Sequence, residues 1–539
     1  MSQTVFMQIY DFVIVGSGFG GSVSALRLAE KGYSVCVVER GKRFADSDFP
    51  KNNWDVRRYL WVPLLKCFGI QNISLFRNIM VLSGSGVGGG SLVYANTLLK
   101  PSDHFFSSPA WNQLANWREE LDPHYETARQ MLGVTTNPRL TFVDRTLEEC
   151  AKDMGKEHTF KSAEVGIFFG EPGVTVSDPY FGGTGPARAG CIDCGGCMVG
   201  CQHNAKNTLT KNYLYFAEKL GISILPEREA TDIRPRLEEG VKTSYDIHIV
   251  QSTAWFKKEP SVLRAKNVIL SGGVLGTLSL LFRCKYTTRS LPLISERLGH
   301  AVRTNSEALL GVTELDANKN RDYSKGIAIT SIFHPDAHTH IEPVRYSRGS
   351  DFMRLLAAPM VDGSHRLLRP LKLVWSILSQ PRQCIKLLTN RDWSSNTVIF
   401  LVMQTIDNQL RFHLGRSLFT GFRKRLVTEP APGSGTIPSY IPIGHQVARA
   451  FAKKVGGIPQ SAINEVLLNI PTTAHILGGC AIGASSETGV VNTQHQLFGY
   501  PGIYVCDGST IPANLGVNPS LTITAMTERA MNFIPRKNA

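Results

Sequence analysis

The alternation of apolar and polar residues predicts a βαβ unit at the start of the chain. Residues 11–15 and 33–38 form two short, continuously apolar runs, and residues 22–31 between them have the apolar spacing of a helix. Short apolar runs bounded by glycine are typical of strands that are covered on both faces. A parallel, Rossmann-like sheet is therefore expected at the N-terminus.

Later segments indicate that this first domain is resumed twice along the chain. Further strands are expected at 222–225, 245–250, 268–273 and 503–505, and helices at 207–220 and 521–533. Residues from about 300 to 460 are strand-rich with helical inserts. The expected fold class is α/β, or α+β for the whole chain, with a discontinuous Rossmann-like dinucleotide domain (1–100, 185–300 and 470–539), a helical and irregular extension (101–184) and an antiparallel-sheet substrate domain (301–469).

Composition and charge narrow the class of protein. The 539 residues are 42% hydrophobic and 19% charged, which is typical of a globular protein too long for one small core. The 58 Lys and Arg exceed the 44 Asp and Glu, giving a net charge of +14. An excess of positive charge is typical of proteins that bind nucleic acid or an anionic membrane surface, and also of any protein from a basic host proteome. No RNA-binding signature or zinc-finger spacing occurs, so no nucleic-acid partner is expected.

The N-terminus carries no secretory signal, since Met1 to Met7 has no basic residue. No apolar stretch reaches the roughly 18 residues that a bilayer span needs. The chain is therefore expected in the cytoplasm or peripherally on the inner face of a membrane.

A glycine loop between the first strand and helix indicates a dinucleotide site. Gly16, Gly18 and Gly21 have the GxGxxG spacing that allows a tight turn, close approach to a pyrophosphate and helix–strand packing. Glu39 ends the second strand, where a carboxylate can bind ribose hydroxyls. The alternative is a glycine-rich turn without ligand. FAD is favoured over NAD because a second glycine loop (82–91) and the C-terminal segment have no role in a simple NAD domain.

Several motifs resemble those of one enzyme family. They are Gly86-Val-Gly88-Gly89-Gly90-Ser91, Leu298-Gly299, His475-Ile-Leu-Gly478-Gly479-Cys480, Val505-Cys506-Asp507-Gly508-Ser509 and the run from Gly516 to Ala525. In this order, and over nearly the full length, the chain resembles the glucose–methanol–choline (GMC) oxidoreductases and, among them, the cholesterol oxidase branch. The C-terminal block is the most specific part of the likeness.

The resemblance implies FAD-dependent oxidation of a hydrophobic alcohol, above all the 3β-hydroxyl of a sterol, with O2 or an electron carrier as acceptor. It places Phe19, Gly20 and Glu39 at the ADP half of FAD, Gly90 and its neighbours beside the pyrophosphate and isoalloxazine, Ala230 near adenine, and Asp507 and Gly508 at the ribityl–phosphate region. Tyr94 replaces an asparagine of the secreted sterol oxidases. No histidine stands in the second glycine loop to anchor flavin covalently, so FAD is expected to be non-covalent.

The resemblance also places His475 and Asn518 at the flavin's reactive nitrogen. An imidazole titrates near neutral pH and suits removal of a hydroxyl proton, while the amide of Asn518 can hold oxygen without titrating. The alternatives are a buried structural histidine and a turn asparagine before Pro519. Glu342 matches the active-site carboxylate of cholesterol oxidases, which isomerise a 5-ene-3-ketone to the 4-ene; its alternative is a surface carboxylate or one in a salt bridge near Arg345.

Four cysteines indicate a possible metal site. Cys191, Cys194, Cys197 and Cys201 have the ligand spacing of a ferredoxin-type [4Fe–4S] cluster, although the usual proline after the fourth is replaced by Gln202. Zinc bound by four thiolates is a second possibility. The third is a loop of reduced thiols or local disulfides. A cluster near the flavin would make the enzyme a dehydrogenase; otherwise dioxygen could reoxidise it.

The segment from Gly363 to Arg391 is basic and apolar, with six Lys or Arg and no acid. It reads as a pair of amphipathic helices broken at Pro381, with Trp375 placed to lie at a membrane interface. The alternative is a helical insert packed on the substrate domain.

Two other functions remain open from the sequence. One is an FAD-dependent dehydrogenase of long-chain or terpenoid alcohols that passes electrons to a carrier, because pocket residues vary within one fold. The other is a flavin-bound, membrane-associated protein without turnover.

Overall fold

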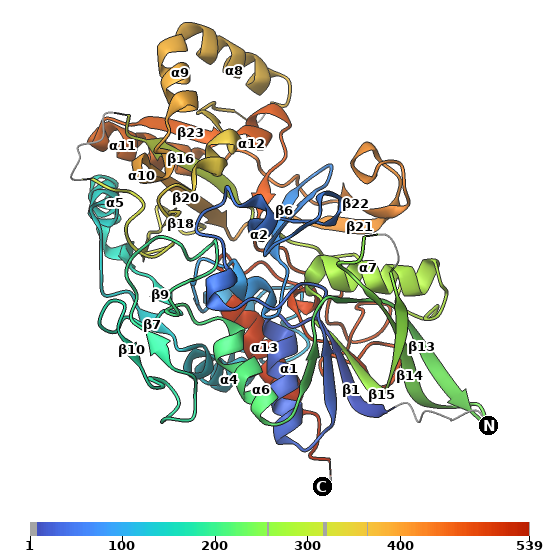
Figure 1. The fold of residues 1–539 in the computed structure, drawn as a ribbon. Coiled ribbons are helices and arrows are strands. Elements are labelled where there is room, and N and C mark those ends of the chain that lie inside the picture. Colours follow the sequence, from blue (N-terminus) through green and yellow to red (C-terminus); the bar gives the residue numbers. More distant parts are fainter. Residues whose placement is uncertain (1–7, 256–257, 316–320, 364, 538–539) are drawn as a thin grey trace.

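The computed structural model describes residues 8–255, 258–315, 321–363 and 365–537. The N-terminal residues 1–7, discussed above for a signal, and Ser364 of the basic stretch lie outside the described residues. The structure has two main sheets. A seven-stranded sheet occupies the lower right of Figure 1, and a five-stranded sheet lies above it to the left.

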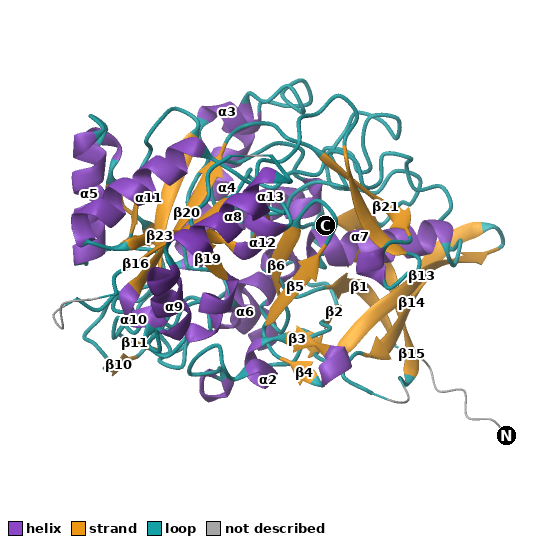
Figure 2. Ribbon diagram, turned by 90° about the horizontal axis from the view of Figure 1, so that it is seen from above, coloured by secondary structure: helices purple, strands orange, loops and turns teal. Residues whose placement is uncertain are grey.

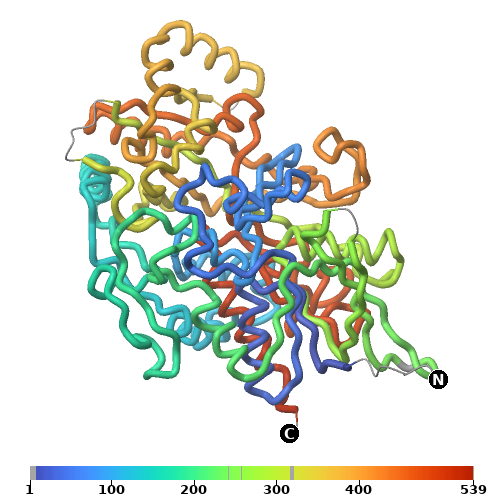
Figure 3. The backbone as a smooth tube through the Cα atoms, viewed as in Figure 1, coloured from blue at the N-terminus to red at the C-terminus, as the bar shows by residue number. Residues whose placement is uncertain are grey.

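The seven-stranded sheet is the Rossmann-like sheet that the sequence predicts. Its order is β12 (Ser223–Leu225), β2 (Val35–Val38), β1 (Ile9–Val15), β15 (Pro260–Leu270), β14 (Val241–Gln251) and β13 (Arg228–Glu238), with β25 (Ile503–Val505) also paired to β15. The strands from β12 to β15, and β25, run parallel, whereas β13 and β14 are antiparallel additions. Three distant parts of the chain thus meet in one sheet (Figure 3).

The register aligns the carboxyl ends of the parallel strands. Val15 pairs with both Val38 and Leu270, and Leu270 pairs with Val505, so these four residues form one row across the sheet. The next residues in each strand therefore leave the sheet at the same edge. Ligands of open α/β sheets bind at this edge, because loops and helix N-termini converge there.

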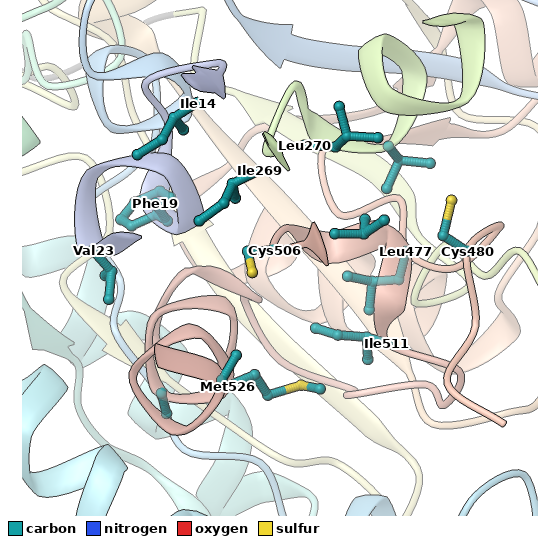
Figure 4. Packing of buried hydrophobic residues seen from close by; sticks show 14 of the residues in the cluster. Ile14, Phe19, Val23, Ile269, Leu270, Leu477, Cys480, Cys506, Ile511 and Met526 are labelled. Atoms are coloured by element: carbon teal, nitrogen blue, oxygen red, sulfur yellow. The ribbon is translucent and has the colours of Figure 1, made fainter. Parts of the chain in front are cut away.

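Helices from distant segments cover this sheet. They are α1 (Phe19–Glu30), α4 (Trp117–Leu132), α6 (Tyr213–Lys219), α7 (Gly273–Tyr286) and α13 (Ser520–Asn532). Helix α1 packs against α6 and α13, and α13 packs against α4 (Figure 1). Figure 4 shows side chains of the buried core that these elements share with the sheet, with Ile14, Ile269 and Cys506 among them.

The five-stranded sheet is antiparallel, as expected for the substrate region. Its order is β18 (Thr339–Val344), β20 (Thr397–Gln404), β16 (Ala308–Thr313), β23 (Ile458–Ala462) and β19 (Ala357–Pro359), and α11 (Pro442–Val455) packs against it (Figure 2). Because side chains alternate between the faces of a strand, Glu342 and Val344 share a face with Leu401 and Leu309, with which the register aligns them.

The remaining elements have two to twelve residues each. The helices are α2 (Val56–Tyr59), α3 (Asp103–Phe106), α5 (Phe142–Asp153), α8 (Leu368–Ser379), α9 (Pro381–Thr389), α10 (Trp393–Asn396) and α12 (Ile463–Leu467). The strands are β3 (Trp61–Val62), β4 (Cys67–Phe68), β5 (Gln71–Leu75), β6 (Met80–Gly84), β7 (Thr135–Thr136), β8 (Lys161–Ser162), β9 (Glu164–Val165), β10 (Thr175–Val176), β11 (Arg188–Ala189), β17 (Ser331–Ile332), β21 (Leu410–Gly415), β22 (Arg425–Pro430) and β24 (Thr472–Thr473).

The mixed α/β fold class is confirmed, and some element ends differ from the prediction. Helix α6 starts at Tyr213 rather than near 207, because the Asn212 side chain accepts a hydrogen bond from the Tyr213 amide and caps the helix there. Strand β15 ends at Leu270, since Gly272 and Gly273 already begin α7. Within the described part of the chain, each helix is too short or too polar to cross a bilayer.

Candidate active site

A cavity of about 1510 Å³ opens at the carboxyl edge of the parallel strands and extends to the five-stranded sheet. We call it the main cavity. It is larger than the roughly 300–1,000 Å³ of an ordinary ligand pocket, so it can hold a dinucleotide and a second molecule. The predicted site residues that line it are Gly16, Gly18, Phe19, Gly20, Glu39, Gly90, Ala230, Asp507, Gly508, His475 and Asn518.

The first glycine loop packs tightly everywhere except at its centre. A Cβ atom on Gly16 would lie 2.2 Å from the Ser271 carbonyl oxygen, and one on Gly21 would lie 2.0 Å from the Gly16 oxygen. A Cβ atom on Gly18 would meet no protein atom within 4 Å. Gly18 precedes α1, whose first backbone N–H groups lack intrahelical partners and favour an anion. The open side of Gly18 therefore fits a pyrophosphate.

Glu39 joins the two glycine loops in this structure. Its Oε2 atom accepts hydrogen bonds from the Ser17 amide (3.1 Å) and hydroxyl (2.7 Å). Its Oε1 atom accepts from the amides of Gly41 (2.8 Å) and Gly86 (3.3 Å). The carboxylate lines the main cavity while fixing the loops, so it is rigidly placed for a ribose.

Other predicted contacts lie in the cavity wall or directly behind it. The Asp507 carboxylate accepts hydrogen bonds from the Ser509 amide (2.9 Å) and the Thr277 hydroxyl (2.6 Å), and burial raises its pKa. The Ser91 hydroxyl donates to the Gly88 carbonyl (2.7 Å). Gly21, Gly86 and Ser91 do not line the cavity; they shape the loops that do. Tyr94 lines it, with its hydroxyl donating to the Asn207 carbonyl (2.9 Å).

His475 is held by a carboxylate that the sequence analysis missed. Its Nδ1 atom lies 2.8 Å from Oε1 of Glu307, and the Ala474 amide donates to Oε2 of the same carboxylate (3.0 Å). A carboxylate accepts the Nδ1 hydrogen, which leaves Nε2 as the free acceptor. Burial lowers the pKa of His475, but the charge and hydrogen bond of Glu307, with the charge of Glu342, outweigh burial and raise it above its ordinary value.

Asn518 stands between His475 and Glu342. Its Nδ2 atom is 3.4 Å from Nε2 of His475 and 3.3 Å from Oε2 of Glu342. Its Oδ1 atom is buried without a hydrogen-bond partner. An unpartnered buried oxygen in a cavity wall is costly unless a ligand satisfies it, which fits a flavin or alcohol group at this place.

Glu342 is brought to the site, but it does not line the main cavity. Its side chain is fully buried (0% exposed), and Oε1 lies 3.0 Å from Nε2 of His340, two residues earlier on the same face of β18. The expected alternative partner, Arg345, instead lies 3.9 Å from Asp144. The carboxylate therefore meets the cavity only through Asn518.

The cavity wall next to these polar groups is apolar. Leu309 of β16, Ile399 and Leu401 of β20, and Val344 of β18 line it from one face of the five-stranded sheet. Met198, Met353 and Ile329 extend this wall from the surrounding loops. The site thus combines an imidazole–amide pair with a hydrocarbon-like surface.

The four cysteines of the segment 191–201 line a separate small cavity, but their expected role as metal ligands gains no support. All four carry free thiols, and among the described residues no three His, Cys, Asp or Glu side chains are arranged to hold a metal ion. Burial, followed by the charge of Cys197, raises the pKa of Cys194 to about 12. Burial keeps these thiols neutral in the absence of a metal ion, and the metal site stays a prediction.

Comparisons with known proteins agree with this geometry. Residues 440–527 match the family model described as GMC oxidoreductase, and residues 14–48 match an NAD(P)-binding Rossmann-like domain. The chain is 47% identical to a cholesterol oxidase of Mycobacterium tuberculosis (98% of this chain, 91% of the relative) and 46% identical to one of Acinetobacter baumannii (98% and 95%). A solved structure of pyridoxine 4-oxidase from Mesorbium loti matches with a TM-score of 0.61 at 15% identity, covering 97% of this chain and 99% of that one.

Together with these relatives, a Rossmann-like sheet whose loops open onto an imidazole–amide pair defines an FAD-dependent oxidoreductase that acts on CH–OH groups. The chain belongs to the GMC oxidoreductases, in the branch of the cholesterol oxidases.

Glu307 and His340 were not found from the sequence. Glu307 is 168 residues from His475, and no local motif surrounds it. The signal that could have found it is alternation: Glu307 directly precedes β16 and is two residues before Leu309, and both residues line the cavity. This alternation identifies Glu307 as a site residue only once β16, β20 and β18 are known to be neighbours.

Proposed function

We propose that this enzyme oxidises the 3β-hydroxyl of a sterol, with FAD as its cofactor. The observation that carries the proposal is the pairing of His475 and Asn518 with the apolar wall of Leu309, Ile399, Leu401 and Val344 in one cavity. A fused hydrocarbon ring system matches that wall, and its single hydroxyl matches the two polar side chains. The cholesterol oxidase relatives support the same substrate class.

FAD, when bound, supplies the acceptor for the carbon-bound hydride. The residues that would hold it are Gly18 and Phe19 at the start of α1, Glu39, Gly90, Ala230 and Gly508, all of which line the main cavity. The second glycine loop offers backbone rather than a histidine or cysteine nucleophile, so we propose that FAD is held non-covalently.

Three side chains share the task of removing the hydroxyl proton from the alcohol. Nε2 of His475 accepts the hydroxyl proton, because Glu307 holds the Nδ1 hydrogen and fixes the ring. The amide of Asn518 orients the alcohol oxygen. Glu307 is a positioning residue, since it acts through His475.

We assign to Glu342 the proton shift that would turn a 5-ene-3-ketone into the 4-ene. The Asn518 amide separates this carboxylate from the cavity, so the assignment requires the amide to move aside. Product analysis with Glu342→Gln tests it: the variant should accumulate the 5-ene ketone, and an unchanged 4-ene product would remove the assignment.

Anaerobic mixing with a panel of alcohols tests the substrate class. Cholesterol should bleach the flavin faster than straight-chain alcohols of similar length. The second candidate class is long-chain alcohols, because the chain is also 23% identical to the long-chain-alcohol oxidase FAO4B of Arabidopsis thaliana. Faster bleaching by those alcohols would favour that class. Reoxidation by air, compared with a one-electron dye, then identifies the acceptor.

We also propose that helices α8 and α9 dock on an anionic lipid surface. The pair projects from the top of the molecule in Figure 1. Leu371, Val374, Trp375 and Leu378 form an exposed stripe at helical spacing on α8, with Trp375 71% exposed. The same two helices carry Lys372, Arg382 and Lys386, and the described residues from 363 to 391 include no acid, which favours negatively charged lipid.

A second exposed loop supports this orientation. The loop between β21 and β22 exposes Leu418, Phe419 and Phe422 together with Arg423 and Lys424. Phe419 and Lys424 also line the main cavity. Docking through this loop and α8 would place the cavity beside the membrane that holds a sterol.

Vesicle binding tests the docking surface. Leu371→Ser combined with Trp375→Ser and Leu378→Ser should abolish sedimentation with phosphatidylglycerol–phosphatidylcholine vesicles. Leu220→Ser with Leu293→Ser is the control, since both leucines are exposed elsewhere. Equal binding of the two variants, or equal binding of the native enzyme to pure phosphatidylcholine, would contradict the proposal.

A further inference from the structure

The main cavity has an outer arm that the oxidation chemistry does not use. Strand β5 and the turn that follows it line one side of this arm, and the hairpin of β21 and β22 lines the other. The two sides touch, because the Thr428 hydroxyl donates to Oδ1 of Asn78 (3.1 Å) and the rings of Phe76 and Phe412 pack edge to face. Figure 1 shows β22 beside β6. The apolar side chains that line the outer arm are Ile73, Leu75, Phe76, Phe419 and Leu426.

The outer arm leads away from the expected flavin site. Strand β6 ends at Gly84, just before the second glycine loop, and begins at Met80, which pairs with Leu75 of β5. Because a strand advances about 3.4 Å per residue, β6 covers about 14 Å from Met80 to Gly84. The turn at Arg77 therefore lies at the opposite end of β6 from the glycine loop. A steroid nucleus with a short side chain has the length to reach from one end to the other.

The outer arm is continuous with the apolar wall beside His475. Strand β6 pairs with β24, whose Thr472 precedes His475 by three residues and lines the cavity. Strand β24 in turn contacts β16, which carries Leu309 of the apolar wall. A molecule whose hydroxyl lies at His475 can therefore extend along one surface into the outer arm.

Four cationic side chains line the far part of the outer arm. All are exposed, and they are Arg77, Arg416, Lys424 and Arg425. Residues 408–428 contain no Asp or Glu. Glu429 lines the cavity but is already engaged, with its Oε1 atom 3.5 Å from Nη1 of Arg411 and 3.8 Å from Nδ1 of His413. In the described part of the chain, none of the four cations forms an ion pair with a carboxylate.

The positive charge of the outer arm is not balanced by the phosphates expected from FAD. The pyrophosphate is expected beside Gly18, and a Cβ atom on Gly89 would lie 2.7 Å from the Cα atom of Gly18. A Cβ atom on Gly84 would lie 2.4 Å from the Gly89 oxygen, so both glycine loops adjoin the Gly84 end of β6. The cations stand at the other end. A positive field beside an apolar wall attracts an anionic amphiphile.

We propose that the enzyme accepts 3β-hydroxysterols whose side chain ends in a carboxylate, and that the four cations of the outer arm bind this group. The inference rests on the proposed function and names a substrate class within it. His475 and Asn518 hold the hydroxyl, the steroid nucleus packs on the apolar wall, and the tail carboxylate lies among the cations. The cations act on binding rather than on removal of the hydride or proton, so they determine specificity.

An anionic lipid head group offers the same chemistry as a tail carboxylate. The loop between β21 and β22 carries the exposed Leu418 and Phe422 as well as the cations, so head groups of a bilayer are the second source of an anion. The two sources differ in their dependence on a membrane. A tail carboxylate binds from solution, whereas head groups act only when a bilayer is present, so the test is carried out without lipid.

A matched acid and ester test the proposal. Flavin-loaded enzyme is mixed without oxygen with 3β-hydroxy-5-cholenoic acid or with its methyl ester, each dissolved with a neutral cyclodextrin, and bleaching of the flavin is followed. The acid should half-saturate the enzyme at a concentration at least about fivefold lower than the ester, because several weak ion pairs act together. The limiting rates should agree, and high salt should remove the difference by screening. Equal half-saturating concentrations at low salt would overturn the proposal and leave the cations to lipid head groups.

A charge-removing variant locates the effect in the outer arm. Arg416→Ala combined with Lys424→Ala and Arg425→Ala should raise the half-saturating concentration of the acid at least about fivefold, to that of the ester. The ratio of the two concentrations is the readout, because a general disturbance of the fold would change acid and ester alike. An acid preference that persists in this variant would overturn the proposal.

The control variant removes the same number of exposed cations elsewhere. Arg57→Ala combined with Arg145→Ala and Lys152→Ala changes the net charge equally, at residues that do not line the cavity. This control should keep the preference for the acid. An equal loss of preference in both triple variants would show that net charge, not the outer arm, selects the acid.

FAD content and a second class of alcohols separate this inference from the proposed function. Loss of FAD from the outer-arm variant would show that the cations hold the cofactor, which would overturn the inference. If no sterol bleaches the flavin, the proposed function fails. A preference for ω-hydroxy fatty acids over their methyl esters would then show that anion recognition by the outer arm holds on a different carbon skeleton.

Discussion

The Nδ1 atom of His475 lies 2.8 Å from Oε1 of Glu307, although the two residues are 168 positions apart in the chain. This contact fixes which nitrogen of the imidazole faces the cavity. It also stabilises the positive charge that the ring gains when it takes a proton. The pair is therefore the source of both the orientation and the basicity of the site.

Replacing Glu307 by Gln should move the pH dependence of flavin reduction. A protonated imidazole cannot accept the hydroxyl proton, so the rate falls as the pH drops below the pKa of His475. Glu307 raises this pKa, so the acid limb of the native enzyme lies above pH 6.5. Removing the charge should shift the limb to lower pH and reduce the plateau rate by about a hundredfold.

Glu307→Asp is the control for this experiment. It keeps the charge but shortens the side chain. The pH of its acid limb should therefore stay close to that of the native enzyme, while its plateau rate of flavin reduction falls. A limb at the same pH in the native enzyme and Glu307→Gln would show that the carboxylate does not set the basicity of His475.

Two glycine variants separate cofactor binding from folding. Gly18→Ala adds a Cβ where no protein atom lies within 4 Å, so the protein should fold normally. The new methyl occupies the expected pyrophosphate space, so FAD affinity should fall by at least about tenfold. Gly21→Ala forces a Cβ to 2.0 Å from the Gly16 oxygen and should instead lower the free energy of unfolding, by about 1–3 kcal/mol.

Flavin content and thermal unfolding of the apoprotein distinguish these outcomes. Normal FAD affinity in Gly18→Ala would contradict the placement of the pyrophosphate at the start of α1.

Burial of Glu465 should make stability depend on pH. Burial raises its folded pKa from 4.5 to about 8, against the hydrogen bond from the Leu309 amide and the charge of Arg369. The folded state therefore holds this proton more tightly than the unfolded chain does. The contribution is complete below pH 4.5 and is lost as the pH rises through about 8.

Glu465→Gln should flatten the fall in melting temperature between these pH values, relative to the native enzyme. Glu487→Gln, at an exposed position, should leave the fall unchanged. Parallel curves for the native enzyme and Glu465→Gln would show that the carboxylate is ionised in the fold.

The thiols of the segment 191–201 should react slowly. Burial raises the pKa of Cys191, Cys194 and Cys197, and only the thiolate is a good nucleophile. At pH 7 these thiols should alkylate at least about a hundredfold more slowly in the folded protein than in the unfolded chain. Mass spectrometry of alkylated peptides measures this. Iron or zinc in stoichiometric amounts in the purified protein would contradict the free-thiol state.

The sequence was most informative where function depends on contiguous residues. The loop from Gly16 to Gly21 and the C-terminal run through Asn518 keep their partners close in the chain, and the structure brings both to the main cavity. Strands and helices could be told apart by the spacing of apolar residues, because this spacing has a different period in buried strands and in amphipathic helices. The assignment of individual residues to FAD contacts and the domain boundaries remain predictions.

The remaining features of the site depend on pairing between strands that are distant in the sequence, which local patterns do not predict. Glu307 and Glu342 reach one site because β16 and β18 both pair with β20, a register that no local pattern specifies. The cysteine spacing alone could not show whether the backbone would wrap the thiols around a metal or pack them as neutral groups. Glu342 had a recognisable position, but only the packing of Asn518 shows that it stands behind the cavity wall.

Single-turnover reduction of His475→Ala by cholesterol, without oxygen, tests most directly whether the imidazole removes the hydroxyl proton. The native flavin should bleach, while the variant should keep bound, yellow FAD and bleach about 10²- to 10⁴-fold more slowly. Bleaching of His475→Ala at the native rate would contradict this role for His475.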